Sequence, residues 1–140
     1  MRALMDTNVI LDFFLARNPH YENAKEIFSL VYKEEIDAYT TASSITDIYY
    51  IVAKRLGNDS AREVLKSLFN LVTIISINGE DCALALNLPM VDYEDALVSI
   101  CANKEDMDFI VTNDADFLSV DASIVRVITP SCFLETIALE

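Results

Sequence analysis

The sequence predicts an α/β fold with three layers, α/β/α, in which the central layer is a mostly parallel sheet. Short apolar runs rich in β-branched residues alternate with segments of helical periodicity through most of the chain. Strands that alternate with helices in this way pair in parallel and carry helices on both faces of the sheet. The chain has 140 residues, of which 53% are hydrophobic, and shows no linker, internal repeat or low-complexity tract. We therefore expect a single domain over residues 1–140.

The elements of the first half follow from apolar spacing and from capping residues. Asn18 and Pro19 are typical of a helix start, with Asn18 as the N-cap and Pro19 at the first helical position. Gly57 and Asn58 end the helix that follows the second strand. In chain order, we expect strands at 2–5 and 38–41 and helices that begin at Asn18-Pro19, Ser43-Ser44 and Asp59-Ser60.

The second half continues the alternation. A β-branched run at 71–77 predicts a buried strand, and the short helical pattern at 78–87 is stopped by Pro89. Asp92 is expected to cap the next helix. The remaining elements are strands at 109–111 and 124–128 and a closing helix that begins at Thr129-Pro130.

The composition argues against several classes of function. Ten basic and 23 acidic residues give a net charge of 10 − 23 = −13, which disfavours a broad basic surface for nucleic acid and docking on an anionic membrane. The two glycines, Gly57 and Gly79, stand too far apart for the glycine-rich loops that bind nucleoside phosphates or dinucleotides. A hydrolase triad or a thiol protease would depend on the one histidine, His20.

Cysteine usage and the N-terminus indicate a reducing compartment. The three cysteines are widely spaced in apolar surroundings, so we expect buried free thiols. The apolar N-terminus carries Asp6 and Asp12, which a signal peptide does not tolerate. The longest uncharged stretch, 67–79, is too short to span a bilayer. We therefore expect a cytoplasmic protein without a membrane partner, whose chemistry comes from carboxylates.

Four carboxylates are expected at one edge of the predicted sheet. Asp6 and Asp114 each follow a strand, and a parallel α/β sheet binds ligands at the carboxyl ends of its strands. Asp47 and Asp95 are predicted in the first turns of two helices whose N-termini lie at the same edge. Carboxylates crowded in one crevice stay ionised only with a cation among them. Mg²⁺ and Mn²⁺ prefer such oxygen ligands and can activate a water molecule and polarise a phosphoryl oxygen. The pattern therefore favours metal-assisted phosphodiester hydrolysis.

Most of these acids also have a structural interpretation. Asp92 and Asp95 form a D-x-x-D pair that is typical of a helix cap, with the second acid favoured by the helix dipole. Asp47 stands three residues after Ser44, as in a capping box. Asp114 lies in a turn, where Asp is common. The four placements together are less probable by accident than any one of them.

Further polar residues could support the acids or hold a nucleic acid. Glu94 and Asp116 are near enough to serve as supporting groups, although solvated surface acids are the alternative. Arg62 and Lys66 stand four residues apart, so they share one helix face. That basic stripe could guide an RNA backbone, and its alternative is an ordinary solvated surface.

Three segments of the chain resemble motifs of the PIN-domain family. MDTNVILD at 5–12 resembles the first motif, with Asp6 as a metal-site acid and Asn8 as its hydrogen-bonding support. VDYEDAL at 91–97 resembles the motif of the third acid, with Asp95 in its place and Asp92 able to share its role. VTNDADF at 111–117 resembles the T-x-D-x-x-F motif, with Asp114 as the fourth acid and Thr112 as a polar support. The second acid of the family is usually Glu, where this chain offers Asp47.

The resemblance covers essentially the whole chain and implies a PIN-like fold with nuclease activity. It implies a magnesium- or manganese-dependent endoribonuclease that acts on single-stranded RNA. In it, Asp6, Asp95 and Asp114 would hold the metal, and Asp47 would be a further catalytic acid. A stand-alone domain of this length resembles the VapC-like ribonuclease toxins of type II toxin–antitoxin modules, which implies a small antitoxin partner and a homodimer.

Two rival functions remain open from the sequence. The first is a catalytically idle PIN-like module that binds RNA or a protein partner through the same crevice. The second is a phosphate-accepting receiver domain, which needs a pair of acids at the end of the first strand. Only Asp6 stands there, so the receiver domain ranks last.

Overall fold

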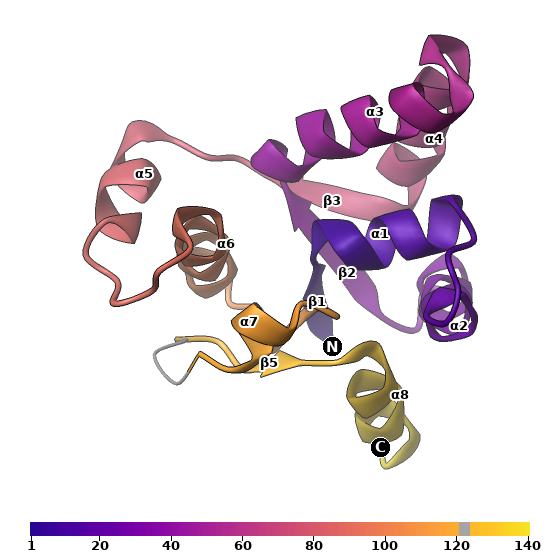
Figure 1. Cartoon of the computed structure of the whole chain (residues 1–140). Coiled ribbons are helices and arrows are strands. Elements are labelled where there is room, and N and C mark those ends of the chain that lie inside the picture. Colours follow the sequence, from indigo (N-terminus) through magenta and orange to yellow (C-terminus); the bar gives the residue numbers. More distant parts are fainter. Residues whose placement is uncertain (121–123) are drawn as a thin grey trace.

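The central sheet has five parallel strands in the order β3-β2-β1-β4-β5 (Figure 1). This arrangement comes from a computed structural model that describes residues 1–120 and 124–140. The strands are β1 (Arg2–Met5), β2 (Asp37–Thr41), β3 (Val72–Ile75), β4 (Phe109–Val111) and β5 (Val127–Ile128). Because β1 is central, the chain order reverses on its two sides, which is where a parallel sheet opens a crevice at its carboxyl edge.

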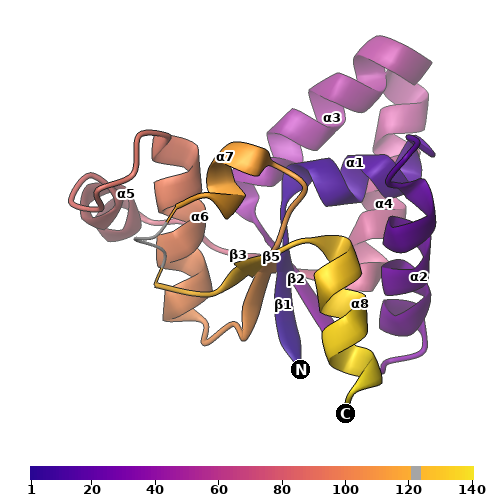
Figure 2. The same cartoon turned by 60° about the horizontal axis from the view of Figure 1, so that its bottom comes forward.

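Helices cover both faces of the sheet, which confirms the three-layer prediction (Figure 2). Along β1 the side chains alternate, since Ala3 and Met5 join one hydrophobic cluster and Leu4 joins the other. Residues from α1, α2, α3, α4 and α8 complete the first cluster, and residues from α6 and α7 complete the second. The helices are α1 (Thr7–Phe14), α2 (Tyr21–Tyr32), α3 (Ala42–Leu56), α4 (Asn58–Leu71), α5 (Gly79–Ala85), α6 (Tyr93–Lys104), α7 (Ala115–Leu118) and α8 (Pro130–Ala138).

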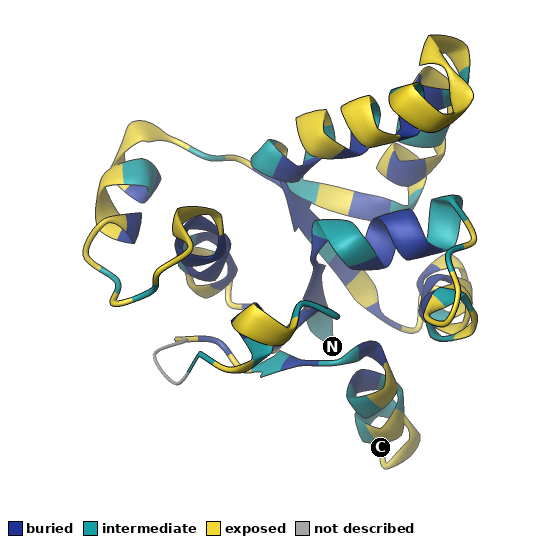
Figure 3. Cartoon of the chain, in the orientation of Figure 1, coloured by how far each residue is buried: buried dark blue, intermediate teal, exposed yellow. Residues whose placement is uncertain are grey.

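Burial follows this layering (Figure 3). The three strands at the centre of the sheet are largely buried, while the outer surfaces of α3, α4 and α5 are exposed. No helix in the described residues is both long and apolar enough to cross a membrane. The three cysteines are free, as expected, but only Cys101 is buried, while Cys82 and Cys132 are half-buried.

Three helices end without glycine in a conformation that usually favours glycine. Ala16, Glu34 and Asp106 follow α1, α2 and α6 with φ of 50°, 60° and 55°. At each of these ends, the next residue donates its backbone N–H to the carbonyl five positions earlier, for example Arg17 N to Asp12 O at 3.0 Å. This is the Schellman pattern, which satisfies carbonyls at the helix end.

The structure corrects several sequence predictions. The second helix begins at Tyr21 rather than at Pro19, because the first of its carbonyls to accept a helical bond is that of His20, from Ala24 N at 3.1 Å. Asp47 lies in the second turn of α3 rather than the first, since α3 begins at Ala42. Two strands are shorter than expected, the one predicted at 71–77, which is Val72–Ile75, and the last one, which is Val127–Ile128.

The helix α1 was not predicted at all. It follows Asp6 directly, and Asp6 is its N-cap through a bond from Thr7 N to Oδ1 at 2.9 Å. With only eight residues, α1 is too short for apolar periodicity to stand out. Because this helix was not predicted, the group of polar residues that it places beside the acids was not expected either. That group is described below.

Candidate active site

Asp6 is fixed in place at the carboxyl end of β1. Its backbone N–H extends the ladder to Val111 O at 3.0 Å, so the side chain stands at the edge of the sheet. Oδ2 accepts bonds from Thr112 Oγ1 at 2.8 Å and from Asn8 Nδ2 at 3.1 Å. Burial nevertheless raises the pKa of Asp6, with a smaller contribution from the charge of Asp114. Asp6 is therefore a buried carboxylate whose orientation is set by its neighbours.

Asn8 and Thr112 connect Asp6 to the loop that carries Asp114. Thr112 Oγ1 accepts bonds from Asn8 Nδ2 at 2.9 Å and from Asp114 N at 3.0 Å. Asn8 Oδ1 accepts a bond from Asn113 N at 2.9 Å. The two residues predicted as polar supports thus link the ends of β1 and β4 in one hydrogen-bond network.

At the start of α6, one acid caps the helix and a different acid has a carboxylate without a partner among the described residues. Asp92 Oδ1 accepts the bond from Asp95 N at 3.0 Å, so Asp92 is the cap. The carboxylate of Asp95 has no hydrogen bond or ion pair among the described residues, although Asp95 is only 8% exposed. Burial, followed by the charges of Asp92, Asp6, Asp114 and Glu94, raises the pKa of Asp95 to about 7.

These acids line one cavity of about 330 Å³ at the carboxyl edge of the sheet. Asp6, Asp92, Glu94, Asp95 and Asp114 contribute to its wall. Burial, and then the nearby carboxylate of Asp47, raise the pKa of Glu94. The cavity therefore concentrates negative charge in a partly desolvated place.

The donor chemistry of the cavity fits a hard divalent cation. The side-chain donors are carboxylate oxygens, and each of them becomes easier to ionise when a cation is present. The hydroxyl of Thr7, which lines the same cavity, is buried and has no hydrogen-bond partner in the described part of the chain. Within residues 1–120 and 124–140, no three His, Cys, Asp or Glu side chains already converge as an ion site. Direct contact of one ion with three of these carboxylates would require them to move closer together, whereas an ion such as Mg²⁺ that keeps several waters needs only one or two of them.

The structure distributes the sequence-predicted site residues unevenly. Asp6, Asn8, Asp92, Asp95 and Asp114 line the cavity, and Thr112 is buried behind Asp6. Asp116 lines a neighbouring cavity of about 740 Å³ that also contacts Asp92 and Asp95.

The remaining predicted residues lie outside the wall of the acid cavity. Asp47 is exposed and faces Glu94. Arg62 and Lys66 are exposed on α4; Lys66 pairs with Glu63 at 3.2 Å, and Arg62 lies 5.9 Å from the centre of the Tyr49 ring.

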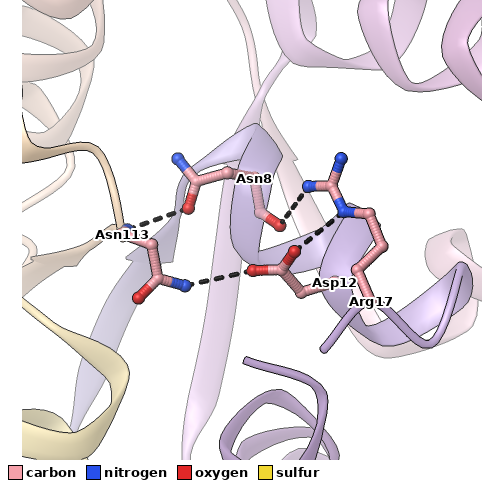
Figure 4. Close-up of polar contacts among 4 residues, drawn as sticks. All are labelled: Asn8, Asp12, Arg17 and Asn113. Carbon is pink, nitrogen blue, oxygen red and sulfur yellow. Dashed lines mark hydrogen bonds and ion pairs between the residues drawn. The ribbon is translucent and has the colours of Figure 1, made fainter. Parts of the chain in front are cut away.

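Three polar residues beside the acids were not predicted as part of the site: Asp12, Arg17 and Asn113 (Figure 4). Arg17 Nε bonds to Asp12 Oδ1 at 2.8 Å, and Asn113 Nδ2 bonds to Asp12 Oδ2 at 3.1 Å. Asn8 and Asp12 are four residues apart, so a helix from Thr7 would have placed them on one face. That spacing was the available signal.

The chain is similar in sequence to a known protein family and to a named ribonuclease. A family model described as PIN domain matches residues 2–116. Ribonuclease VapC1 of Aquifex aeolicus (strain VF5) is 27% identical over 139 residues, covering 96% of this chain and 94% of that protein.

Solved structures share the fold at lower identity. A chain of VapBC2 from Rickettsia felis, bound to a DNA fragment from their promoter, superposes with a TM-score of 0.70 at 16% identity, covering 92% of this chain and 98% of that chain. VapC20 of Mycobacterium tuberculosis, a Sarcin-Ricin loop cleaving toxin, gives 0.68 at 15% identity, with coverage of 89% and 98%.

Proposed function

This chain belongs to the PIN domain family, and we propose that it is a divalent-metal-dependent endoribonuclease that hydrolyses phosphodiester bonds in single-stranded RNA. The observation that carries the proposal is the shared cavity of Asp6, Asp95 and Asp114, where burial and neighbouring charges raise the pKa of Asp6 and Asp95. The similarity to a ribonuclease along nearly the whole chain supports it.

Asp6, Asp95 and Asp114 would hold Mg²⁺ or Mn²⁺. When bound, such an ion polarises a phosphoryl oxygen and makes a water molecule a stronger nucleophile. The chain's own contribution is to orient the acids, since Thr112 and Asn8 hold Asp6 through hydrogen bonds. Asp92 leaves the carboxylate of Asp95 free by capping α6 itself.

Glu94 and Asp47 form the remaining acidic part of the proposed site. Glu94 lines the cavity, and its raised pKa suits a group that accepts a proton from an attacking water molecule. Asp47 acts beside it, by contributing to that pKa. Asp116, at the neighbouring cavity, is a supporting acid in this proposal.

The biological setting we propose is a toxin–antitoxin module in the cytoplasm. Several structures that share the fold come from toxin–antitoxin complexes, including one from Klebsiella pneumoniae with a TM-score of 0.66. We propose a small antitoxin protein as the partner and a homodimer as the assembly. Arg62 and Lys66 would contact the RNA backbone outside the acid cavity.

The test is cleavage of single-stranded RNA by the purified protein with Mg²⁺ or Mn²⁺, and its loss in EDTA. Asp6→Asn should remove most of the rate, because it takes away the carboxylate at the centre of the network. Asp37→Asn is the matched control, since it makes the same change at an exposed residue. Asp37 lies at the start of β2, at the edge of the sheet opposite the acids. Metal-independent cleavage that survives in Asp6→Asn would overturn the proposal.

The second candidate function is a catalytically idle PIN-like module. The net charge of −13 favours the form of this module that binds a protein partner, because an acidic protein repels RNA unless cations intervene. Binding of RNA or of an antitoxin without any metal-dependent cleavage would support this candidate.

A further inference from the structure

Arg17 is the cationic side chain in the described wall of the acid cavity. It also lines a second cavity of about 510 Å³, together with Asn18, His20 and Asn113. Asp114 lines both cavities as well. The two cavities are therefore adjacent, and Arg17 lies where they meet.

The backbone and two side-chain bonds hold Arg17 rigidly. The helix end at Ala16 turns the chain so that Arg17 N bonds to Asp12 O at 3.0 Å. The guanidinium then reaches back along α1, with Nε on Asp12 Oδ1 at 2.8 Å and Nη2 on Asn8 O at 3.2 Å (Figure 4). Asn113 Nδ2 completes the partners of Asp12 at 3.1 Å. Arg17 is thus ordered before any ligand binds.

These bonds leave most of the guanidinium available. An arginine carries five N–H donors in a planar fork, and the two bonds above use one on Nε and one on Nη2. The side chain of Arg17 is 33% exposed, whereas that of Asp12 is 5% exposed. The bond from Nε is sufficient to pair Arg17 with the buried carboxylate of Asp12. The remaining N–H donors of Arg17 are therefore available to another anion.

We propose that Arg17 binds the RNA phosphate next to the scissile one, and that the adjoining cavity receives that nucleotide. This inference rests on the proposed ribonuclease function. A guanidinium fork matches the oxygen geometry of a phosphate, and one that is already ordered loses little side-chain entropy on binding. The amide groups of Asn18 and Asn113 and the imidazole of His20 supply hydrogen-bonding groups for the same nucleotide. A strand that leaves the acids through this cavity passes Arg17 first.

The experiment separates phosphate binding from neutralisation of Asp12. The pair of variants is Asp12→Asn and Asp12→Asn/Arg17→Gln, because neither leaves a buried charge without its partner. Binding of a fluorescent single-stranded oligoribonucleotide is measured against salt concentration, with Ca²⁺ in place of Mg²⁺ and the RNA checked for integrity. Arg126→Gln, an exposed arginine that lines neither cavity, is the control.

The proposal expects the double variant to bind about tenfold more weakly than Asp12→Asn, with equal melting temperatures. The salt slope should fall by about 0.7, the value of one phosphate contact on a single strand. An unchanged slope would reduce Arg17 to a counter-ion of Asp12 and overturn the proposal, as would a wild type that binds no RNA. If the wild type never cleaves RNA but the double variant still has the smaller salt slope, the ribonuclease function is refuted and Arg17 remains a phosphate-binding residue.

Discussion

Asp81 and Asp95 occupy the same local position in two neighbouring helices and have opposite electrostatic environments. Each is the third residue of its helix, and each donates its backbone N–H to an Asx residue three positions earlier, at 2.9 Å for Asn78 and 3.0 Å for Asp92. Both are buried, at 3% and 8% exposure. The helix starts differ in one bond: Asp81 Oδ2 accepts a bond from the backbone N–H of Asn78, whereas the carboxylate of Asp95 accepts none from Asp92.

Their tertiary partners differ more. Besides the local bond from Asn78 N at 3.0 Å, Asp81 Oδ2 accepts a bond from Lys104 Nζ at 2.7 Å, and the Lys104 bond is the main reason that the pKa of Asp81 is lowered. Asp95 instead faces other acids, and its pKa rises to about 7. Asp81 links α5 to the end of α6, whereas Asp95 is repelled by neighbouring carboxylates, and a bound cation would relieve that repulsion. A buried acid is therefore a candidate for function when its charge has no partner, and a structural element when it has one.

The largest expected difference between the two acids is in RNA cleavage. Asp95→Asn should lower the metal-dependent rate by at least about 100-fold, because the ion that it helps to hold supplies several kcal/mol of transition-state stabilisation. Asp81→Asn should cleave normally per folded molecule. Initial rates on one single-stranded RNA, corrected for the folded fraction, give the comparison. Equal losses in the two variants would remove the functional distinction between the two acids.

The next difference is the sign of the change in stability without metal. Asp81→Asn should destabilise the fold by about 2–3 kcal/mol, somewhat less than the loss for a fully buried pair, since Lys104 is 31% exposed. Asp95→Asn should stabilise it by at least about 1.4 kcal/mol at pH 7.5, the equivalent of one pKa unit. Urea unfolding in EDTA measures both changes, and Mg²⁺ should then stabilise the wild type more than Asp95→Asn. If Asp95→Asn were destabilising and Mg²⁺ shifted both proteins equally, Asp95 would be a helix-start residue only.

The two acids should also give opposite dependences on pH. A carboxylate with a raised pKa costs stability as pH rises from its unfolded value to its folded value, which for Asp95 is a window from about 4 to about 7. Asp81, with a lowered pKa, contributes stability that disappears only as pH falls below its ordinary value of 3.8. The metal-free wild type should therefore melt at a higher temperature at pH 5.5 than at pH 8. Asp95→Asn should flatten that trend, and an unaltered trend would contradict the assignment.

The smallest effect concerns the two caps. Asn78→Ala should cost about 1 kcal/mol, as for other lost N-caps. Asp92→Ala should cost less in EDTA, because removing its charge also relieves Asp95, on which Asp92 exerts the largest charge effect. Thermal melts of the two variants, with Asp59→Ala as a control for an exposed helix-start acid, check this order. If Asp92→Ala costs as much as Asn78→Ala, the repulsion between Asp92 and Asp95 is negligible.

The layers of the fold could be predicted from the sequence, and so could the sheet edge at which the acids lie. Alternating strands and helices leave few topologies, and in a parallel sheet the residues that follow strands meet at one edge whatever the details of packing. Asp6 and Asp114 could therefore be placed together from their positions after β1 and β4. The capping role of Asp92 was also readable, because a cap depends on a few consecutive residues.

Which acids face one another and which are neutralised depends on how the chain folds and could not be predicted from the sequence. Asn78–Asp81 and Asp92–Asp95 have the same spacing, and the largest cause of the lowered pKa of Asp81 is Lys104, which stands 23 residues after it. Asp12 and Arg17 became visible only with α1, whose eight residues carry too short a pattern to identify. Local order depends on neighbours in the chain, whereas the pKa of a buried group depends on burial and on charges that folding brings from distant segments.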